Sequence, residues 1–261
     1  MQKKTERAVP QRATAQPVVH PIPRVREELD TKSMHFGATE IQSRMKLREP
    51  HALELEYTRT MMGFLMWKAQ PARIAMLGLG GGSLAKFCHR HLPDASMVVV
   101  EINPHVIALR DAFGVPSDGP RFKVIEADGA CFIAESDERF DVLLVDAFDA
   151  EGMPEALGSQ RFYDDASDAL ATGGLFVANL HVGHPHFPVH VDRVQQAFGD
   201  RALRVDDGDG SNAVMFARKN RELRSSALAP LRKPPTLADA AWLQVRGAFS
   251  RIAHAARLPQ A

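Results

Sequence analysis

The chain has 261 residues, enough for one substantial α/β domain with extensions or for two small domains. Hydrophobic residues make up 45% of it and charged residues 25%, which are ordinary values for a globular protein. Acidic and basic side chains balance at 32 each, so no net charge directs the chain toward nucleic acid or a membrane surface. No apolar run is long enough to span a membrane, and the N-terminus lacks the apolar part of a secretory signal. We therefore expect a cytoplasmic protein without nucleic-acid or membrane partners.

The first fifty residues divide into a tail and a small β region. Residues 1–32 contain prolines and charges but no hydrophobic periodicity, which predicts a flexible N-terminal tail. Residues 33–50 hold two short alternating segments, SMHFG and IQSRMKL, which predict a small β-hairpin. The segment HALELEYTRTMMGFLMW then places apolar side chains at helical spacing, so we expect a helix there.

From residue 73 onward strands and helices alternate. Seven strand-like segments follow one another: RIAMLG, MVVVEI, FKVIEAD, FDVLLVD, GGLFVANL, ALRVDD and NAVMFAR. Most of the first five are nearly unbroken apolar runs, which indicates parallel strands buried on both faces. A glycine-rich turn joins the last two, which predicts an antiparallel hairpin at the sheet edge. We predict a Rossmann-like α/β catalytic domain over residues 51–219, with a seven-stranded, mostly parallel sheet of the S-adenosylmethionine methyltransferase type.

Residues 220–261 are predicted to form a basic C-terminal extension with an amphipathic helix. The apolar stripe of this helix comprises Trp242, Val245, Phe249, Ile252 and Ala256. Such a stripe must be buried, either against the same chain or against a second subunit. We favour packing within the chain, as a lid or brace. The expected assembly is a homodimer.

A glycine turn follows the first strand of the alternating series. Gly78, Gly80, Gly81 and Gly82 lie between this strand and the helical segment SLAKFCHRHL, where the chain reverses tightly and a ligand must approach bare backbone. Alone the motif is weak, because glycine turns occur in many folds. The next strand ends in VVVEIN and places Glu101 about 20 residues after the turn, where a carboxylate accepts the ribose hydroxyls. Together these features predict a nucleoside site.

Aspartates follow the next two strands, at the same edge of the sheet. Asp128 and Gly129 follow the third strand, where a carboxylate or an amide can reach the edge of an adenine. Asp146 ends the fourth strand, and Asp149 follows three residues later. Asp128 and Asp149 could equally cap helix N-termini. A pair of carboxylates beyond the fourth strand favours a cationic substrate, a sulfonium or an amine, over a dinucleotide.

Over residues 34–219 the sequence resembles the polyamine aminopropyltransferases, the spermidine and spermine synthase family. The similar segments are EIQSRMKL, ELEYTRTMM, MLGLGGGSLAKF, VVVEINPHVI, EADGACF, LLVDAFDAEGMP and NAVMFA. The resemblance implies that Gln42 contacts the nucleoside, that Glu101 holds its ribose and that Asp128 lies at its adenine.

The resemblance also implies an amine site and a reaction. Tyr57 and Asp149 would bind the amine, and Asp146 would assist its attack. The implied co-substrate is decarboxylated S-adenosylmethionine, whose methylene carbon beside the sulfonium is attacked by an amine such as putrescine, with release of 5′-methylthioadenosine. No tightly bound cofactor is expected.

One position in the glycine turn departs from the family pattern. Gly81 stands where family members carry an aspartate that binds the aminopropyl ammonium. Two alternatives therefore stay open. One is a methyltransferase that uses S-adenosylmethionine itself, and the other is a catalytically silent nucleoside-binding module.

A histidine-rich segment, HVGHPHFPVH, follows the fifth strand at residues 181–190. It could bind a metal ion, but it contains two prolines and lacks cysteine or carboxylate partners. We therefore favour a loop over the rim of the substrate pocket and expect no metal.

Overall fold

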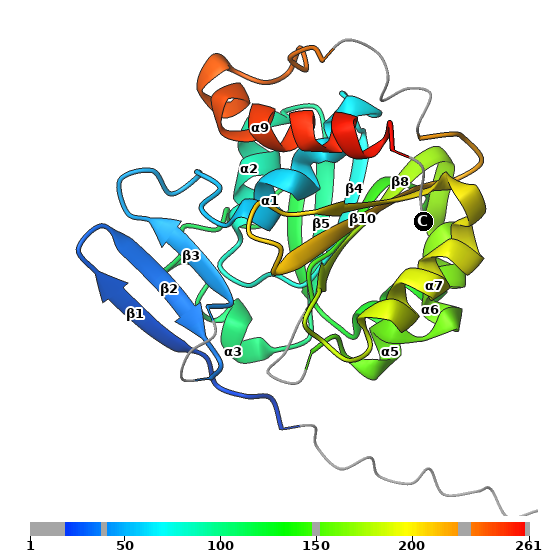
Figure 1. Ribbon diagram of the computed structural model, residues 1–261. Coiled ribbons are helices and arrows are strands. Elements are labelled where there is room, and N and C mark those ends of the chain that lie inside the picture. Colours follow the sequence, from blue (N-terminus) through cyan, green and yellow to red (C-terminus); the bar gives the residue numbers. More distant parts are fainter. Residues whose placement is uncertain (1–18, 38–40, 148–151, 224–230, 259–261) are drawn as a thin grey trace, which may run out of the picture.

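The computed structural model describes residues 19–37, 41–147, 152–223 and 231–258, and is built around one central sheet (Figure 1). The seven strands of this sheet lie in the order β6-β5-β4-β7-β8-β10-β9. Their bounds are β4 Arg73–Leu77, β5 Ser96–Glu101, β6 Phe122–Glu126, β7 Phe140–Val145, β8 Leu170–His181, β9 Ala202–Asp206 and β10 Asn212–Arg218. Within this sheet the strands β4 to β8 are parallel, and β10 runs antiparallel to both β8 and β9. This sheet confirms the predicted Rossmann-like fold class.

The strands bury both of their faces, as the apolar runs predicted. In β7, Val142 and Leu144 belong to one hydrophobic core, whereas Leu143 and Val145 belong to a second core on the other face. Successive strand residues point to opposite faces, so a sheet covered on both sides needs an unbroken apolar run.

Helices cover the two faces of the sheet. One core includes α4 Gly129–Glu135, α5 Glu155–Gly158, α6 Gln160–Ala169 and α7 Phe187–Phe198. The other includes α1 Glu56–Met61, the 3₁₀ helix η1 Met62–Met66, α2 Ser83–His91 and the C-terminal α9 Asp239–Ala255. A short 3₁₀ segment, η2 Gly199–Arg201, leads into β9. None of the helices in the described part of the chain is long and apolar enough to cross a membrane.

The helix expected after β5 is much shorter than the segment PHVIALRDAF suggested. Helix α3 covers only Pro104–Ile107, and turns follow it. The amides of Leu109 and Arg110 bond to carbonyls three residues back, at Val106 and Ile107, instead of four. The sequence pattern therefore predicted the correct location of a helical turn but overestimated its length.

The N-terminal region is a three-stranded antiparallel sheet, which lies to one side of the central sheet (Figure 1). It comprises β1 Arg24–Glu28, β2 Thr31–His35 and β3 Ser43–Lys46. The predicted tail over residues 1–32 is therefore too long, because β1 lies inside it. Every residue of β1 is exposed, so this strand has no buried face that could produce a hydrophobic pattern. Its pairing with β2 rests on backbone hydrogen bonds.

Helix α9 crosses the outer side of α1 and η1, so its apolar stripe packs within the chain (Figure 1). Val245, Phe249 and Ile252 are fully buried there. On the facing element, a Cβ at Gly63 would come within 2.1 Å of the Ile252 Cδ1 atom, so a larger residue at this position would force the Ile252 side chain or the helix to shift.

Candidate active site

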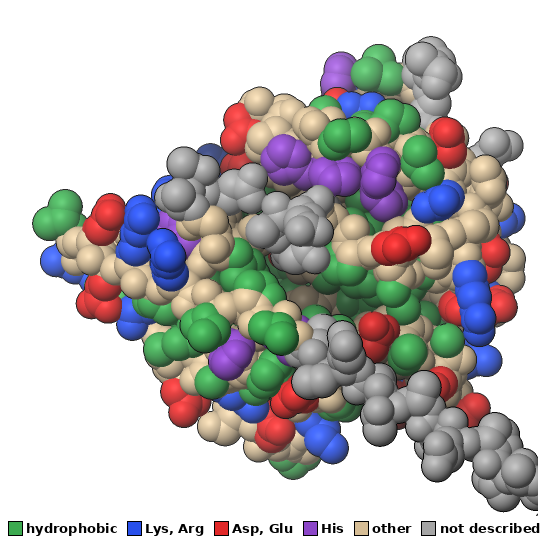
Figure 2. All heavy atoms as spheres, turned by 90° about the horizontal axis from the view of Figure 1, so that it is seen from below, with side chains coloured by type: hydrophobic (Ala, Val, Ile, Leu, Met, Phe, Trp, Pro, Cys, Tyr) green, Lys and Arg blue, Asp and Glu red, His purple; other side chains and the backbone are tan. Residues whose placement is uncertain are grey.

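A cavity of about 820 Å³ lies at the carboxyl ends of the parallel strands. Its walls come from the glycine turn after β4, the ends of β5 and β7, the segment after β6, the N-terminal sheet and the turn between β9 and β10. Figure 2 shows the molecule hollowed on this face, with a row of histidines beside the hollow. Ligands of open α/β sheets bind at this edge, so the cavity is the candidate active site.

The glycine turn is held in a backbone conformation that other residues rarely adopt. Gly78, Gly80 and Gly82 have φ angles of +89°, +50° and +67°. A Cβ at Gly78 would lie 2.2 Å from the carbonyl oxygen of Asp146. Gly78 and Gly80 line the cavity, whereas Gly82 lies against Val115 as the N-cap residue of α2 and does not line it. The turn therefore presents bare backbone to the cavity at two of the three predicted positions.

Glu101 at the end of β5 lies across from this turn. Its Oε2 atom accepts a hydrogen bond from the amide of Leu79 at 2.8 Å, and its Oε1 atom accepts one from the amide of Asn103 at 2.9 Å. Burial raises the pKa of this carboxyl group, and the backbone hydrogen bonds oppose the rise. Two backbone amides thus hold Glu101 in one orientation at the cavity wall.

Asp128 caps a helix, as one of the two sequence interpretations expected, and it also lines the cavity, so its role at an adenine stays a prediction. Its Oδ1 atom accepts a hydrogen bond from the amide of Cys131 at 2.9 Å, which caps the N-terminus of α4. Asp128 and Gly129 also line the cavity. Because Gly129 is the first residue of α4, the helix N-terminus and its capping carboxylate face the same space.

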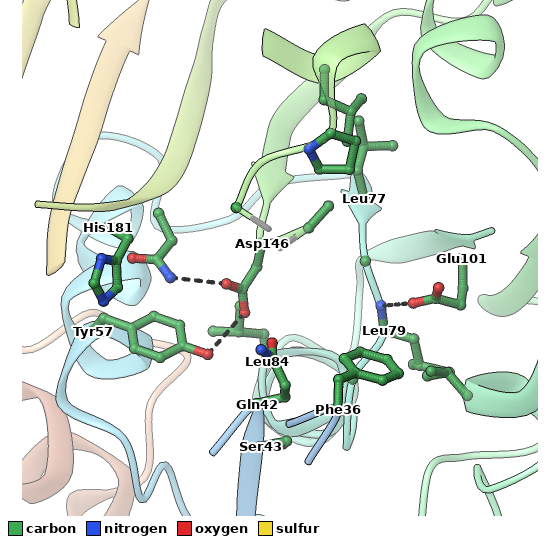
Figure 3. Close-up of a pocket in the computed structure, with 18 of the residues that line it drawn as sticks. Phe36, Gln42, Ser43, Tyr57, Leu77, Leu79, Leu84, Glu101, Asp146 and His181 are labelled. Atoms are coloured by element: carbon green, nitrogen blue, oxygen red, sulfur yellow. Dashed lines mark hydrogen bonds between the residues drawn. The ribbon is translucent and has the colours of Figure 1, made fainter. Parts of the chain in front are cut away.

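Asp146 directly follows β7 at the cavity wall, and two side chains donate hydrogen bonds to it (Figure 3). The Tyr57 hydroxyl donates to Oδ2 at 3.2 Å, and the Asn179 amide donates to Oδ1 at 3.1 Å. Removal from water raises the pKa of Asp146 to about 6, although both hydrogen bonds lower it. Burial, and then the charge of Asp146, raise the pKa of Tyr57. Tyr57 therefore stays a neutral donor beside a carboxylate that changes protonation near neutral pH.

The N-terminal sheet closes the cavity from below in Figure 3. Gln42 lines the cavity just before β3, where its backbone N–H donates to the backbone carbonyl of Met34 at 2.9 Å. Ser43 fills the space beside the unusual glycine of the turn: a Cβ at Gly81 would lie 2.5 Å from Ser43 Oγ and 2.9 Å from a ring carbon of Phe113. The packing therefore leaves no room for a side chain at Gly81.

Two other sequence predictions have different outcomes. Asp149 lies outside the described residues, so its assignment to the amine stays a prediction. The histidine segment does contribute to the cavity wall, through His181, Gly183, His184 and Pro185. Within the described ranges, no group of three or more His, Cys, Asp or Glu side chains is arranged to hold a metal ion.

Sequence reasoning missed several polar residues that line the cavity, and four of them bear on its charge and hydrogen bonding. Asn179 lies in β8, Glu56 begins α1, and Asp207 and Asp209 lie in the turn between β9 and β10. Asn179 could have been found from the sequence, since it is the one polar residue in the apolar run GGLFVANL. A buried polar group needs a hydrogen-bond partner, so such a residue indicates a polar site. The other three gave no signal, since carboxylates at turns and helix starts are common.

The cavity is strongly acidic. Six carboxylates line it, and the described lining residues include neither lysine nor arginine. The carboxylates are Glu56, Glu101, Asp128, Asp146, Asp207 and Asp209. Arg59 and Arg251 pair with Glu56 from outside the lining. The other carboxylates favour a cationic ligand, because low-dielectric walls of one charge sign concentrate ligands of the opposite sign.

Comparisons with known proteins agree with this geometry. The family model of the spermine/spermidine synthase domain matches residues 54–196. A polyamine aminopropyltransferase of Chromobacterium violaceum is 39% identical over 211 residues, which cover 80% of this chain and 81% of that protein. One from Neisseria meningitidis serogroup A is 40% identical over 194 residues, which cover 73% of this chain and 74% of that protein.

A solved structure shares the fold. The crystal structure of a probable spermidine synthase from Corynebacterium glutamicum superposes with a TM-score of 0.66 at 21% identity, covering 88% of this chain and 91% of that one. At this identity the likeness concerns the fold alone.

Fold and cavity together define a Rossmann-like α/β protein with a ligand cavity at the carboxyl ends of the parallel strands, and its relatives identify it as a transferase. The chain belongs to the spermine/spermidine synthase family, because the family model matches most of its catalytic domain and curated relatives align at about 40% identity. The family resemblance that the motifs indicated is confirmed.

Proposed function

We propose that the protein is an aminopropyltransferase that moves an aminopropyl group from decarboxylated S-adenosylmethionine to an amine such as putrescine. The observation that carries this proposal is the acidic cavity, whose described lining residues include six carboxylates and no lysine or arginine. Both substrates are cations, one a sulfonium with an ammonium group and the other an amine. S-adenosylmethionine adds a carboxylate that this lining disfavours.

The nucleoside is assigned to the side of the cavity formed by the ends of β4, β5 and β6. Glu101 is proposed to accept the ribose hydroxyls, since its carboxylate is fixed by two backbone amides. Asp128 and Gly129 are proposed to face the adenine, and Gln42 to contact the nucleoside from the N-terminal sheet. The bare backbone of the glycine turn then allows close approach of the ligand.

The amine is assigned to the side where Asp146 and Tyr57 meet. An ammonium group is no nucleophile, because its nitrogen has no free electron pair. Asp146, ionised above a pKa of about 6, binds this ammonium and takes one proton from it. The freed electron pair forms a bond to the methylene carbon beside the sulfonium. The carbon–sulfur bond breaks, its electrons neutralise the sulfur, and 5′-methylthioadenosine leaves.

Positioning supplies much of the remaining rate enhancement. The Tyr57 hydroxyl and the Asn179 amide hold the carboxylate in a fixed orientation. A base and an electrophile fixed in one cavity convert a bimolecular reaction into an effectively unimolecular one. By family resemblance, Asp149 is proposed to bind the amine chain.

Assembly and location are part of the proposal. We infer that the protein is a homodimer. We also infer a cytoplasmic site of action, because the proposed substrates are small charged metabolites. Light scattering at two protein concentrations tests the dimer, and a mass equal to one chain at both would refute it.

Product identification tests the proposed reaction. The purified protein is incubated with decarboxylated S-adenosylmethionine and 1,4-diaminobutane, and with S-adenosylmethionine and the same amine, and the nucleoside products are analysed by mass spectrometry. We expect 5′-methylthioadenosine from the first mixture only, and no turnover by the Asp146→Asn variant. S-adenosylhomocysteine from the second mixture would instead identify a methyltransferase.

A further inference from the structure

The turn between β9 and β10 brings two carboxylates to the cavity that the reaction at Asp146 does not use. Asp207 is only 7% exposed, and Asp209 lies beside it; both line the cavity. Asp207 accepts hydrogen bonds from the amide and side chain of Asn212, and Asp209 accepts one from the amide of Ser211. Neither carboxylate forms an ion pair with a described residue.

Asp207 and Asp209 differ from the nearby carboxylates Glu56 and Asp206, which form ion pairs with arginines. Glu56 also lines the cavity, but Arg59 and Arg251 both pair with it. Asp206, one residue before Asp207, pairs with Arg204 at 2.7 Å. A charge that is buried without a partner is costly, so a nine-tenths buried carboxylate that lacks a cation is best explained by a cation that arrives with a ligand.

Asn179 gives independent support for a ligand in this part of the cavity. It is 4% exposed, and its Nδ2 atom is committed to Asp146. The Oδ1 atom of the same amide is buried and has no hydrogen-bond partner among the described residues. Because Nδ2 faces Asp146, the amide orientation is fixed, and Oδ1 is left as a free acceptor beside the carboxylate. An N–H group of a bound amine would satisfy it.

The strand register connects Asn179 to the turn. His181 lies two residues further along β8, on the same face as Asn179, and pairs with Asn212 on β10. The Asn212 side chain donates to Asp207 at 3.4 Å. The distance along the strand from Asn179 to His181 is about 6.8 Å, because each residue adds about 3.4 Å. The two nitrogens of 1,4-diaminobutane are separated by five bonds, which span about 6 Å if three bonds of an extended backbone span about 3.5 Å. The length of the diamine is therefore close to this spacing along the strand.

We propose that Asp207, assisted by Asp209, binds the distal ammonium of a diamine acceptor whose other nitrogen reacts at Asp146. The proposal rests on the proposed function and adds the group that selects a diamine over a monoamine. Burial, and secondarily a hydrogen bond to Asp209 and the charge of Asp209, raise the pKa of Asp207. An ammonium group beside this hydrogen-bonded pair of carboxyl groups offsets their negative charge, which is the effect expected of an ammonium subsite.

The test compares 1,4-diaminobutane with butylamine, which has the same chain but lacks the distal nitrogen. We expect Asp207→Asn to raise the KM for the diamine at least about tenfold, the scale of a lost hydrogen bond to a charged group, while the kinetics with butylamine stay unchanged. Asp209→Asn removes the assisting charge and has a smaller effect in the same direction. Asp206→Asn is the matched control, because it removes an equal charge from the preceding residue, whose carboxylate pairs with Arg204. It should change the kinetics with neither 1,4-diaminobutane nor butylamine.

Calorimetry separates this inference from the proposed function. 1,4-Diaminobutane is titrated into the wild-type protein and into each variant, with 5′-methylthioadenosine present and melting temperatures recorded. Weaker diamine binding by both turn variants, but not by Asp206→Asn, supports the subsite even if no turnover occurs. If the wild type produces 5′-methylthioadenosine and both turn variants keep its diamine KM and affinity, the subsite is wrong and the proposed function stands. If Asp207→Asn does not fold, Asp209→Asn alone decides the outcome.

Discussion

Asp146 is the residue whose surroundings most directly determine the chemistry of the cavity. It receives one hydrogen bond from Tyr57 on α1 and another from Asn179 on β8. These donors stabilise the ionised carboxylate, whereas burial disfavours it, and the result is a pKa of about 6. At neutral pH this carboxylate is ionised and able to accept a proton from an ammonium group. Its pKa is also close enough to neutrality to make it a stronger base than an exposed aspartate.

The pH dependence of kcat/KM tests this assignment. We expect kcat/KM to fall as the pH drops through about 6, because protonated Asp146 cannot accept the amine proton. Asn179→Leu removes a hydrogen bond that lowers this pKa, so the acid limb should move to higher pH. Tyr57→Phe should move it in the same direction. An acid limb that stays in place, or that moves to lower pH, in both variants would contradict the assignment.

Thermal unfolding of Asp146→Asn is the control for that experiment. The pKa of Asp146 is raised in the folded protein, so ionising it destabilises the fold at pH values above about 6. The asparagine side chain introduced at position 146 is uncharged and carries no such cost. The variant should therefore be inactive at pH 8 yet melt at the same temperature as the wild type or above it.

Much of the candidate site follows from sequence at the residue scale. Glu101 ends β5, and Asp128 and Asp146 follow the ends of β6 and β7. Parallel strands bring their carboxyl ends to one edge. Asp207 could not be predicted in the same way, because it reaches the cavity through a hairpin whose register no local pattern specifies. The sequence marked Gly81 as unusual, but it could not show why position 81 lacks a side chain. The cause lies in the N-terminal sheet, where Ser43 occupies the space that a side chain would need.

At the scale of elements, predictions succeeded where burial leaves a periodic pattern. The strands of the central sheet are apolar throughout because both faces are covered. Strand β1 is exposed along its whole length, so its sequence carries no such pattern and was assigned to a tail. The C-terminal helix gave a clear stripe, but its partner could not be identified from the stripe alone.

The close contact between η1 and α9 can be tested by a double-mutant cycle. Gly63→Ala forces a methyl group against Ile252 and should lower the free energy of unfolding by about 1–3 kcal/mol. Ile252→Ala leaves a cavity and should lower it by about 2–5 kcal/mol. The double variant should lose less than the sum of the two, because the truncated side chain makes room for the new methyl group.

Urea denaturation of the single and double variants measures these values. Gly247→Ala is the matched control, since it makes the same change on the exposed side of α9, where no atom lies within 4 Å of the new Cβ. It should stabilise the protein by about 0.5–1 kcal/mol, as expected for glycine in a helix interior. Additive losses at Gly63 and Ile252 would show that the two elements do not pack as described.

At the scale of the whole molecule, a neutral chain encloses an acidic cavity. Acidic and basic residues balance at 32 each, yet the described cavity lining contains six carboxylates and no lysine or arginine. The total charge could not reveal this separation, because it depends on which side chains the fold turns inward. Such a cavity attracts cationic substrates and opposes an additional carboxylate.

The affinity for decarboxylated S-adenosylmethionine relative to S-adenosylmethionine measures this property most directly. The two ligands differ by one carboxylate, and calorimetric titration of each into the wild-type protein gives the two dissociation constants. The acidic cavity predicts that the decarboxylated form binds at least about tenfold more tightly, a difference of about 1.4 kcal/mol. Equal or tighter binding of S-adenosylmethionine would contradict the assignment of this cavity to aminopropyl transfer.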